Sequence, residues 1–150
     1  MSDVSGAEAE EYITKGLSAL DNDHFHLALV CFERAAELTD SALVTSALGL
    51  CLVVVRGETG KGIALCREAV AAEPDNTSHY YHLGRALLVS GERDEALRIF
   101  RQGMAVGRDQ RIVAELEALG SRKAPPIAAL DRDHFLNKWL GIFLSRIGMR

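Results

Sequence analysis

The sequence lacks both the long apolar runs of a membrane protein and the usual start of a secreted one. Its first residues, MSDVSGAEAEEY, are acidic and contain no basic segment followed by an apolar stretch, so no secretory signal is predicted. No apolar stretch approaches the ~20 residues that span a bilayer, and the longest candidate, residues 43–55, is shorter than that. A cytoplasmic protein is therefore expected.

Cysteine is also scarce. The three cysteines are odd in number and form no CxxC pair, which argues against a disulfide framework and against a zinc site. Each lies on a predicted helix, on or beside an apolar core position. We therefore expect Cys31, Cys51 and Cys66 to be reduced, buried thiols.

Positive charge is scarce outside the end of the chain. There are 17 Lys/Arg against 21 Asp/Glu, a net charge of −4. Residues 121–150 hold six Lys/Arg against two Asp/Glu, which is +4, so the remaining residues carry −8. Without a basic stripe the body of the chain is not expected to bind nucleic acid. Contact of the basic, aromatic C-terminal segment with a membrane surface is only a minor alternative.

What the sequence does contain is a pattern that recurs every 34 residues. A small, a large and a small residue follow one another at i, i+4 and i+7. The three copies are Ala28, Phe32 and Ala35; Gly62, Cys66 and Ala69; and Ala96, Phe100 and Gly103. A glycine on the preceding predicted helix recurs less strictly, at Gly16, Gly49 and Gly84. Self-similarity at a fixed period indicates an array of stacked helical hairpins, in which the small residues let two helices approach closely.

The apolar spacing predicts about eight helices. They cover residues 7–20, 25–38, 41–56, 61–72, 78–89, 92–106, 111–119 and, after the break at Pro125-Pro126, 134–147. Gly57 and Gly91 fall in equivalent turns, where a positive φ is useful. Gly120 is expected to end the seventh helix.

These features resemble the tetratricopeptide repeat (TPR) family, which pairs W/Y-x-x-L-G-x-x-Y/L on a first helix with A-x-x-x-F-x-x-A-x-x-x-x-P on a second. The matching residues are Tyr80, Leu83, Gly84, Leu87, Ala96, Phe100 and Gly103; Leu48, Gly49, Leu52, Cys66, Ala69 and Pro74; and Tyr12, Gly16, Ala28, Phe32 and Ala35. Lys15 and Asp40 depart from the pattern, where Leu and Pro are usual. The resemblance implies an all-α fold, a right-handed α-α superhelix of the small bacterial type with three repeats and a C-terminal amphipathic helix.

On this basis the chain is expected to have five parts. They are a lead-in (1–8), three repeats (9–110, divided into 9–42, 43–76 and 77–110), a capping helix (111–120), a Pro-containing linker (121–132) and an amphipathic helix (133–150).

The resemblance also implies a concave groove lined by the first helix of each repeat. The family's groove positions, carried onto this chain, are Ile13, Leu17 and Leu20; Ser46, Leu50 and Val53; and Tyr81, Arg85 and Leu88. Family members that bind the acidic C-terminus of a heat-shock chaperone have Lys, Asn and Arg at such positions. Only Arg85 is of that kind here, so this clamp is not expected. We expect instead an apolar groove that binds a helix or extended peptide of a partner protein and that needs a cover. Packing of these positions between repeats is the alternative, expected to explain some of them but not all.

The predicted C-terminal helix is the candidate cover. Its broad apolar face comprises Phe135, Leu136, Trp139, Leu140, Phe143 and Ile147. An amphipathic helix in an apolar groove is a common mode of recognition, so we expect this helix to occupy the groove of its own chain or of a twin, the latter giving a homodimer by helix exchange. Permanent packing against residues 111–119 is the alternative.

No enzyme signature stands out. His24 and His26 lack further metal ligands nearby, and no nucleophile, base and acid can be grouped from their order. His79 and His82, one turn apart, are expected to be solvated, with metal binding or pH sensing as alternatives. No catalytic residue, metal or cofactor is predicted. The expected function is a non-catalytic adaptor or scaffold; a chaperone for exported proteins of the type III secretion kind, or an enzyme accessory subunit, is the alternative.

Overall fold

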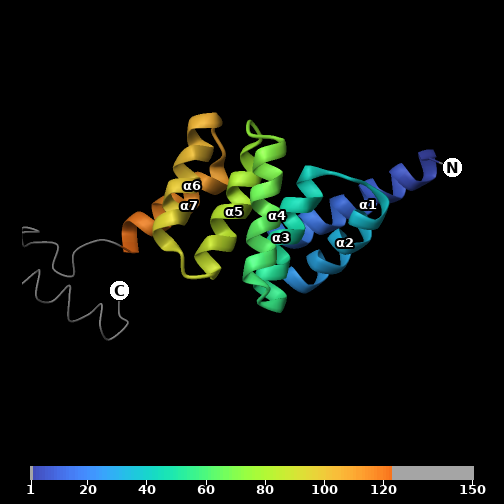
Figure 1. Ribbon diagram of the computed structural model, residues 1–150, viewed down its shortest axis with the longest axis horizontal. Coiled ribbons are helices and arrows are strands. Elements are labelled where there is room, and N and C mark those ends of the chain that lie inside the picture. Colours follow the sequence, from blue (N-terminus) through green and yellow to red (C-terminus); the bar gives the residue numbers. More distant parts are fainter. Residues whose placement is uncertain (1, 123–150) are drawn as a thin grey trace, which may run out of the picture. The chain divides into compact units, whose positions relative to one another are not determined.

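The computed structural model describes residues 2–122, and their side chains from residue 3 to residue 120. Over these residues the regular elements are all α-helices (Figure 1): α1 (Ser2–Asp21), α2 (Phe25–Leu38), α3 (Ala42–Arg56), α4 (Thr59–Ala72), α5 (Thr77–Val89), α6 (Arg93–Val106) and α7 (Gln110–Arg122). None of the described helices is both long and apolar enough to cross a membrane. The chain divides into two units after Ile112. The three helical hairpins lie within the first unit.

The predicted helices agree with the observed ones to within two residues, except at two ends. Helix α1 begins at Ser2 instead of residue 7, and Asp3 in its first turn suits the positive end of the helix dipole. The expected end of α7 at Gly120 is wrong, because the helix continues to Arg122. A side chain at Gly120 would meet nothing within 4 Å, so no packing constraint stops the helix there. The predicted helix 134–147 lies outside the described residues.

The helices pair as three hairpins, α1 with α2, α3 with α4 and α5 with α6. In the first and third hairpins a phenylalanine ring covers the recurring glycine: Phe32 lies against Gly16, and Phe100 against Gly84. The second hairpin has no such ring, and its backbones are in direct contact. A Cβ on Gly49 would lie 2.5 Å from the carbonyl oxygen of Gly62. The small-large-small pattern therefore closes each hairpin as expected.

Each hairpin turn uses a left-handed backbone conformation. Gly57 has φ 66° and Gly91 has φ 85°, and in the first hairpin Asp23 takes the equivalent role with φ 57°. The predicted use of Gly57 and Gly91 is confirmed. Asp23 is acceptable there because a short polar side chain tolerates this region better than other L-residues do.

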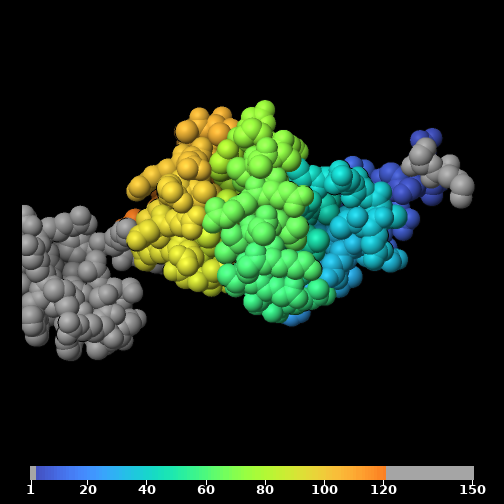
Figure 2. All heavy atoms as spheres, in the orientation of Figure 1, coloured from blue at the N-terminus to red at the C-terminus, as the bar shows by residue number. Residues whose placement is uncertain are grey.

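The three hairpins stack in chain order, so that the middle one is enclosed. Helix α3 packs against α2, α4 and α5, and α4 also contacts α5. In Figure 2 the green second hairpin fills the space between the blue first hairpin and the yellow third one. A helix with neighbours on three sides buries most of its surface, and α3 has eight buried residues out of 15.

All three cysteines are free and buried, as the sequence predicted. Burial raises the pKa of the Cys51 and Cys66 thiols to about 12, and a thiol reacts as the thiolate. Because all three side chains are also shielded from solvent, the folded protein at pH 8 is expected to react with a thiol reagent at none of its three cysteines within minutes, and at all three in denaturant. Rapid reaction of the folded protein would contradict the burial.

Candidate functional site

The predicted groove residues divide into two sets. Five are buried: Ile13, Leu20, Ser46, Leu50 and Val53. Four are partly exposed: Leu17, Tyr81, Arg85 and Leu88. The expectation of a continuous, exposed apolar groove is therefore wrong for the first five. The physical reason is the enclosure of α3 by three helices, which buries all three of its predicted groove positions.

The contacts of the buried set show what they do instead. Ile13 belongs to a core cluster with Ala35 and Val44, and Leu17 packs against this cluster from α1. Val53 lies against Gly62 of α4, inside the second hairpin. Ile13 and Val53 hold neighbouring helices together and, being buried, cannot meet a partner in this conformation.

Ser46 is the centre of a buried polar cluster that the sequence reading missed. Its Oγ lies 3.0 Å from Nδ1 of His79 and 2.8 Å from Nδ1 of His82, both on α5. It also donates to the carbonyl oxygen of Leu43 at 3.2 Å. A hydroxyl has one hydrogen, so with that hydrogen donated to Leu43 both imidazoles must donate from Nδ1 to the Ser46 oxygen.

The expectation that His79 and His82 are solvated is wrong: they are 0% and 1% exposed. Burial, and then the nearby Arg111 cation, lower the pKa of His82 to about 3, so His82 is neutral near pH 7. The sequence did carry a signal. Ser46 is a polar residue within the apolar run 43–55, and a buried hydroxyl needs a hydrogen-bond partner.

A stripe of partly exposed side chains follows one face of α5. Tyr81, Arg85 and Leu88 stand at i, i+4 and i+7. The guanidinium of Arg85 lies 5.4 Å from the ring centroid of Phe25, at the start of α2, and 5.8 Å from that of Tyr81. It also donates to the Tyr81 hydroxyl at 3.3 Å and lies 3.7 Å from Oδ1 of Asp23. Arg85 is thus held between two aromatic rings while its side chain stays 22% exposed.

Arg111, at the start of α7, extends this stripe. Its guanidinium lies 4.6 Å from the Tyr81 ring centroid and donates to Ser78 at 2.9 Å and to Asp109 at 2.7 Å. The hydrogen bond from Arg111 lowers the pKa of Asp109, which keeps this carboxylate ionised. The residues at the centre of this region, hereafter the α5 surface, are Phe25, Tyr81, Arg85, Leu88 and Arg111. Phe25 and Arg111 were missed because neither occupies a family groove position.

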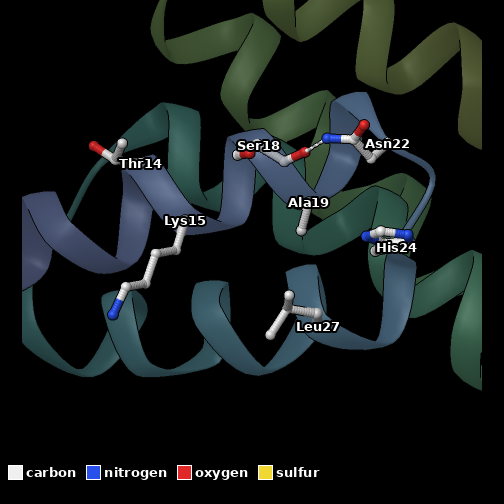
Figure 3. A pocket seen from close by; sticks show the side chains of 7 residues that line it. All are labelled: Thr14, Lys15, Ser18, Ala19, Asn22, His24 and Leu27. Atoms are coloured by element: carbon white, nitrogen blue, oxygen red, sulfur yellow. Dashed lines mark hydrogen bonds between the residues drawn. The ribbon is translucent and has the colours of Figure 1, made fainter.

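The first hairpin has a separate pocket of about 410 Å³ between α1 and α2. Figure 3 shows its lining, which is Thr14, Lys15, Ser18, Ala19, Asn22, His24 and Leu27. Asn22 caps the backbone of α1 by donating to the carbonyl oxygen of Ser18 at 2.8 Å. No predicted groove residue lines this pocket. Over the described part of the chain, no group of three or more His, Cys, Asp or Glu side chains is placed to hold a metal ion.

Comparison with known proteins supports the repeat assignment directly. Residues 56–119 match the family model described as tetratricopeptide repeat. This segment of the chain is therefore similar to the TPR family. No curated protein sequence is significantly similar to it.

Solved TPR domains share the fold of this chain. The second TPR domain of human RPAP3, in complex with the HSP70 peptide SGPTIEEVD, aligns with a TM-score of 0.57 and 15% identity over 77% of this chain and 98% of that one. The Arabidopsis OM64 TPR domain gives 0.60 and 16% over 79% and 98%. The TPR2B domain of yeast Sti1, in complex with pHsp70, gives 0.59 and 18% over 78% and 98%. At these identities the likeness concerns the fold alone.

Proposed function

We propose that this protein is an adaptor that binds a segment of another protein on the α5 surface. TPR domains of the same fold are known in complexes with chaperone peptides, so a peptide is the natural class of ligand. The observation that carries the proposal is the position of Arg85, whose guanidinium lies 5.4 Å from the Phe25 ring centroid and 5.8 Å from that of Tyr81 while its side chain stays partly exposed.

Physical chemistry favours this surface over the rest of the predicted groove. Tyrosine and arginine are among the residues that contribute most to binding at interfaces. An arginine already ordered by its neighbours loses little side-chain entropy when a partner binds. Leu88 adds apolar area one turn further along α5. The expected ligand is therefore a peptide with an apolar side chain close to a carboxylate or carbonyl acceptor, instead of a purely apolar helix.

The test is a peptide selection against the immobilised full chain, followed by affinity measurements on variants. Arg85→Ala is expected to weaken the selected peptides by about 2 kcal/mol, or roughly 30-fold, as for a hot-spot residue. Arg98→Ala is the matched control, because Arg98 is an exposed arginine on α6 that pairs with Glu95 at 3.2 Å. It should leave the affinity unchanged.

Two outcomes would refute the proposal. One is a set of selected peptides that bind wild type and Arg85→Ala equally. The other is equal weakening by Arg85→Ala and Arg98→Ala, which would indicate a nonspecific effect of positive charge. Thermal unfolding of each variant must accompany the affinities, since Arg85 also lies near Asp23 of the first hairpin turn.

A further inference from the structure

The first hairpin carries an apolar surface that the rest of the described chain leaves open. Leu27 and Val30 lie nearly one turn apart on α2 and are 55% and 56% exposed. Leu27 lines the pocket between α1 and α2 and faces Ala19 across it (Figure 3). Leu27, Val30 and this pocket are hereafter the first-hairpin surface.

The equivalent positions of the later hairpins indicate what this side of α2 is placed to contact. One and two periods of 34 residues after Leu27 and Val30 come Lys61 and Ala64, and Glu95 and Arg98. Glu95 accepts a hydrogen bond of 2.6 Å from Arg67 of α4, so this side of the second helix faces the preceding hairpin. On α2 no described hairpin takes that place, and the residues there are more apolar than their counterparts. An open end of a repeat array normally has a polar outer face, so an exposed leucine and valine indicate an occupant.

Net charge indicates which of two occupants fits the first-hairpin surface, the first hairpin of another copy or residues 133–150. Residues 2–38 contain eight acidic side chains against two basic ones, Lys15 and Arg34, which is a net charge of −6. Two first hairpins would therefore repel each other. Residues 133–150 contain three basic side chains against one acidic one, Asp133, which is a net charge of +2. This segment also carries the apolar set that includes Trp139 and is predicted to form one helical face, so it complements the first hairpin in both respects.

The exit of the chain indicates which copy supplies the segment. Residues 110–112 begin α7 beside α5, where Arg111 contacts Ser78, and α5 and α6 lie at the opposite end of the row of hairpins from α1 and α2 (Figure 1). We propose that residues 133–150 of a second copy dock on the first-hairpin surface, and that two copies exchange these segments reciprocally. Reciprocal exchange closes a dimer, whereas one-sided docking would build an open chain. The proposal is independent of the function assigned to the α5 surface.

The test combines light scattering of the full chain with the fluorescence of Trp139, its single tryptophan. The wild-type mass is expected to rise with concentration from that of a 16.3 kDa monomer towards twice that value. Leu27→Glu should raise the dissociation constant at least about tenfold, because it removes the leucine side chain from the proposed contact and places a carboxylate against the apolar face of residues 133–150. It should also shift the Trp139 emission to longer wavelength. Val106→Glu, at a 39% exposed valine on α6, is the control and should change neither readout.

A second variant checks the other half of the contact. Phe143→Glu should weaken association as Leu27→Glu does, and a mixture of the two variants should partly recover it, since one intact pair of surfaces remains. Arg85→Ala should leave association unchanged. A protein that is monomeric at all concentrations would overturn the exchange, even if its Trp139 emission responds to Leu27→Glu, because docking would then occur within one chain. A dimer insensitive to Leu27→Glu would place the interface elsewhere and overturn the docking site.

Discussion

Lowering the pH from 7 to 4.5 is expected to reduce the free energy of unfolding by about 2.5 kcal/mol through His82 alone. Burial holds the pKa of His82 at about 3, against 6.5 for an exposed imidazole. The folded state therefore resists protonation that the unfolded state accepts. The stability that this imidazole contributes is fully present above pH 6.5 and is lost as the pH falls from there towards 3.

The measurement is chemical denaturation at several pH values between 7 and 4.5, with a matched pair of variants. His82→Gln cannot titrate, so its stability should fall less steeply with decreasing pH than that of wild type, whatever its stability at pH 7. His26→Gln changes an exposed histidine on the same array and should retain the wild-type slope. Equal slopes for wild type and His82→Gln would show that His82 is accessible to protons in the folded state.

The hydrogen bonds of Ser46 explain why the folded protein cannot accept a proton on His82 by a small local rearrangement. Its hydroxyl lies within 3.0 Å of an imidazole nitrogen of both His79 and His82, and the three side chains join α3 to α5. A proton added to His82 brings a charge into an interface that is 0–1% exposed at these residues, where an unpaired charge is unfavourable. Acid is therefore expected to loosen the contact between the second and third hairpins first.

Substitution of Gly49 by alanine is expected to lower the free energy of unfolding by about 2 kcal/mol, as overpacking of a close contact does. The new Cβ would lie 2.5 Å from the carbonyl oxygen of Gly62 and 2.9 Å from Sγ of Cys66. The carbonyl oxygen is part of the α4 backbone, so relief requires the two helices of the second hairpin to separate. This outweighs the gain of up to ~1 kcal/mol that alanine normally brings to a helix.

Gly60→Ala is the control, because Gly60 lies in the same hairpin, on α4, and a Cβ there would meet nothing within 4 Å. It should be neutral or stabilising by up to ~1 kcal/mol, through helix propensity alone. Denaturant midpoints and slopes of the two variants and wild type give the comparison. Equal stability of Gly49→Ala and Gly60→Ala would mean that the second hairpin is not closed by contact between its backbones.

Gly49 and Ser46 illustrate a contact that the sequence pattern predicts and one that it does not. The close approach at Gly49 follows from the recurrence of glycine opposite a small residue, a pattern that can be read along the chain. The polar cluster around Ser46 does not follow from any pattern, because Ser46 lies 33 and 36 residues before His79 and His82 in the chain. Ser46 and Leu50 were assigned to a groove by family position, and that assignment ignored the packing of α2, α4 and α5 around their helix.

The sequence by itself determined the architecture: a 34-residue period, the small residues that let helices pair and the turns at Gly57 and Gly91 all report on contacts within a hairpin. Only the tertiary structure decided which side chains remain accessible. It buried Leu50 and Val53, enclosed two histidines and brought Phe25 and Arg111 beside Arg85 and Tyr81. The reason is physical: contacts within a hairpin depend on nearby residues and helical spacing, whereas exposure depends on every neighbour that stacking supplies, and those neighbours are remote in the chain.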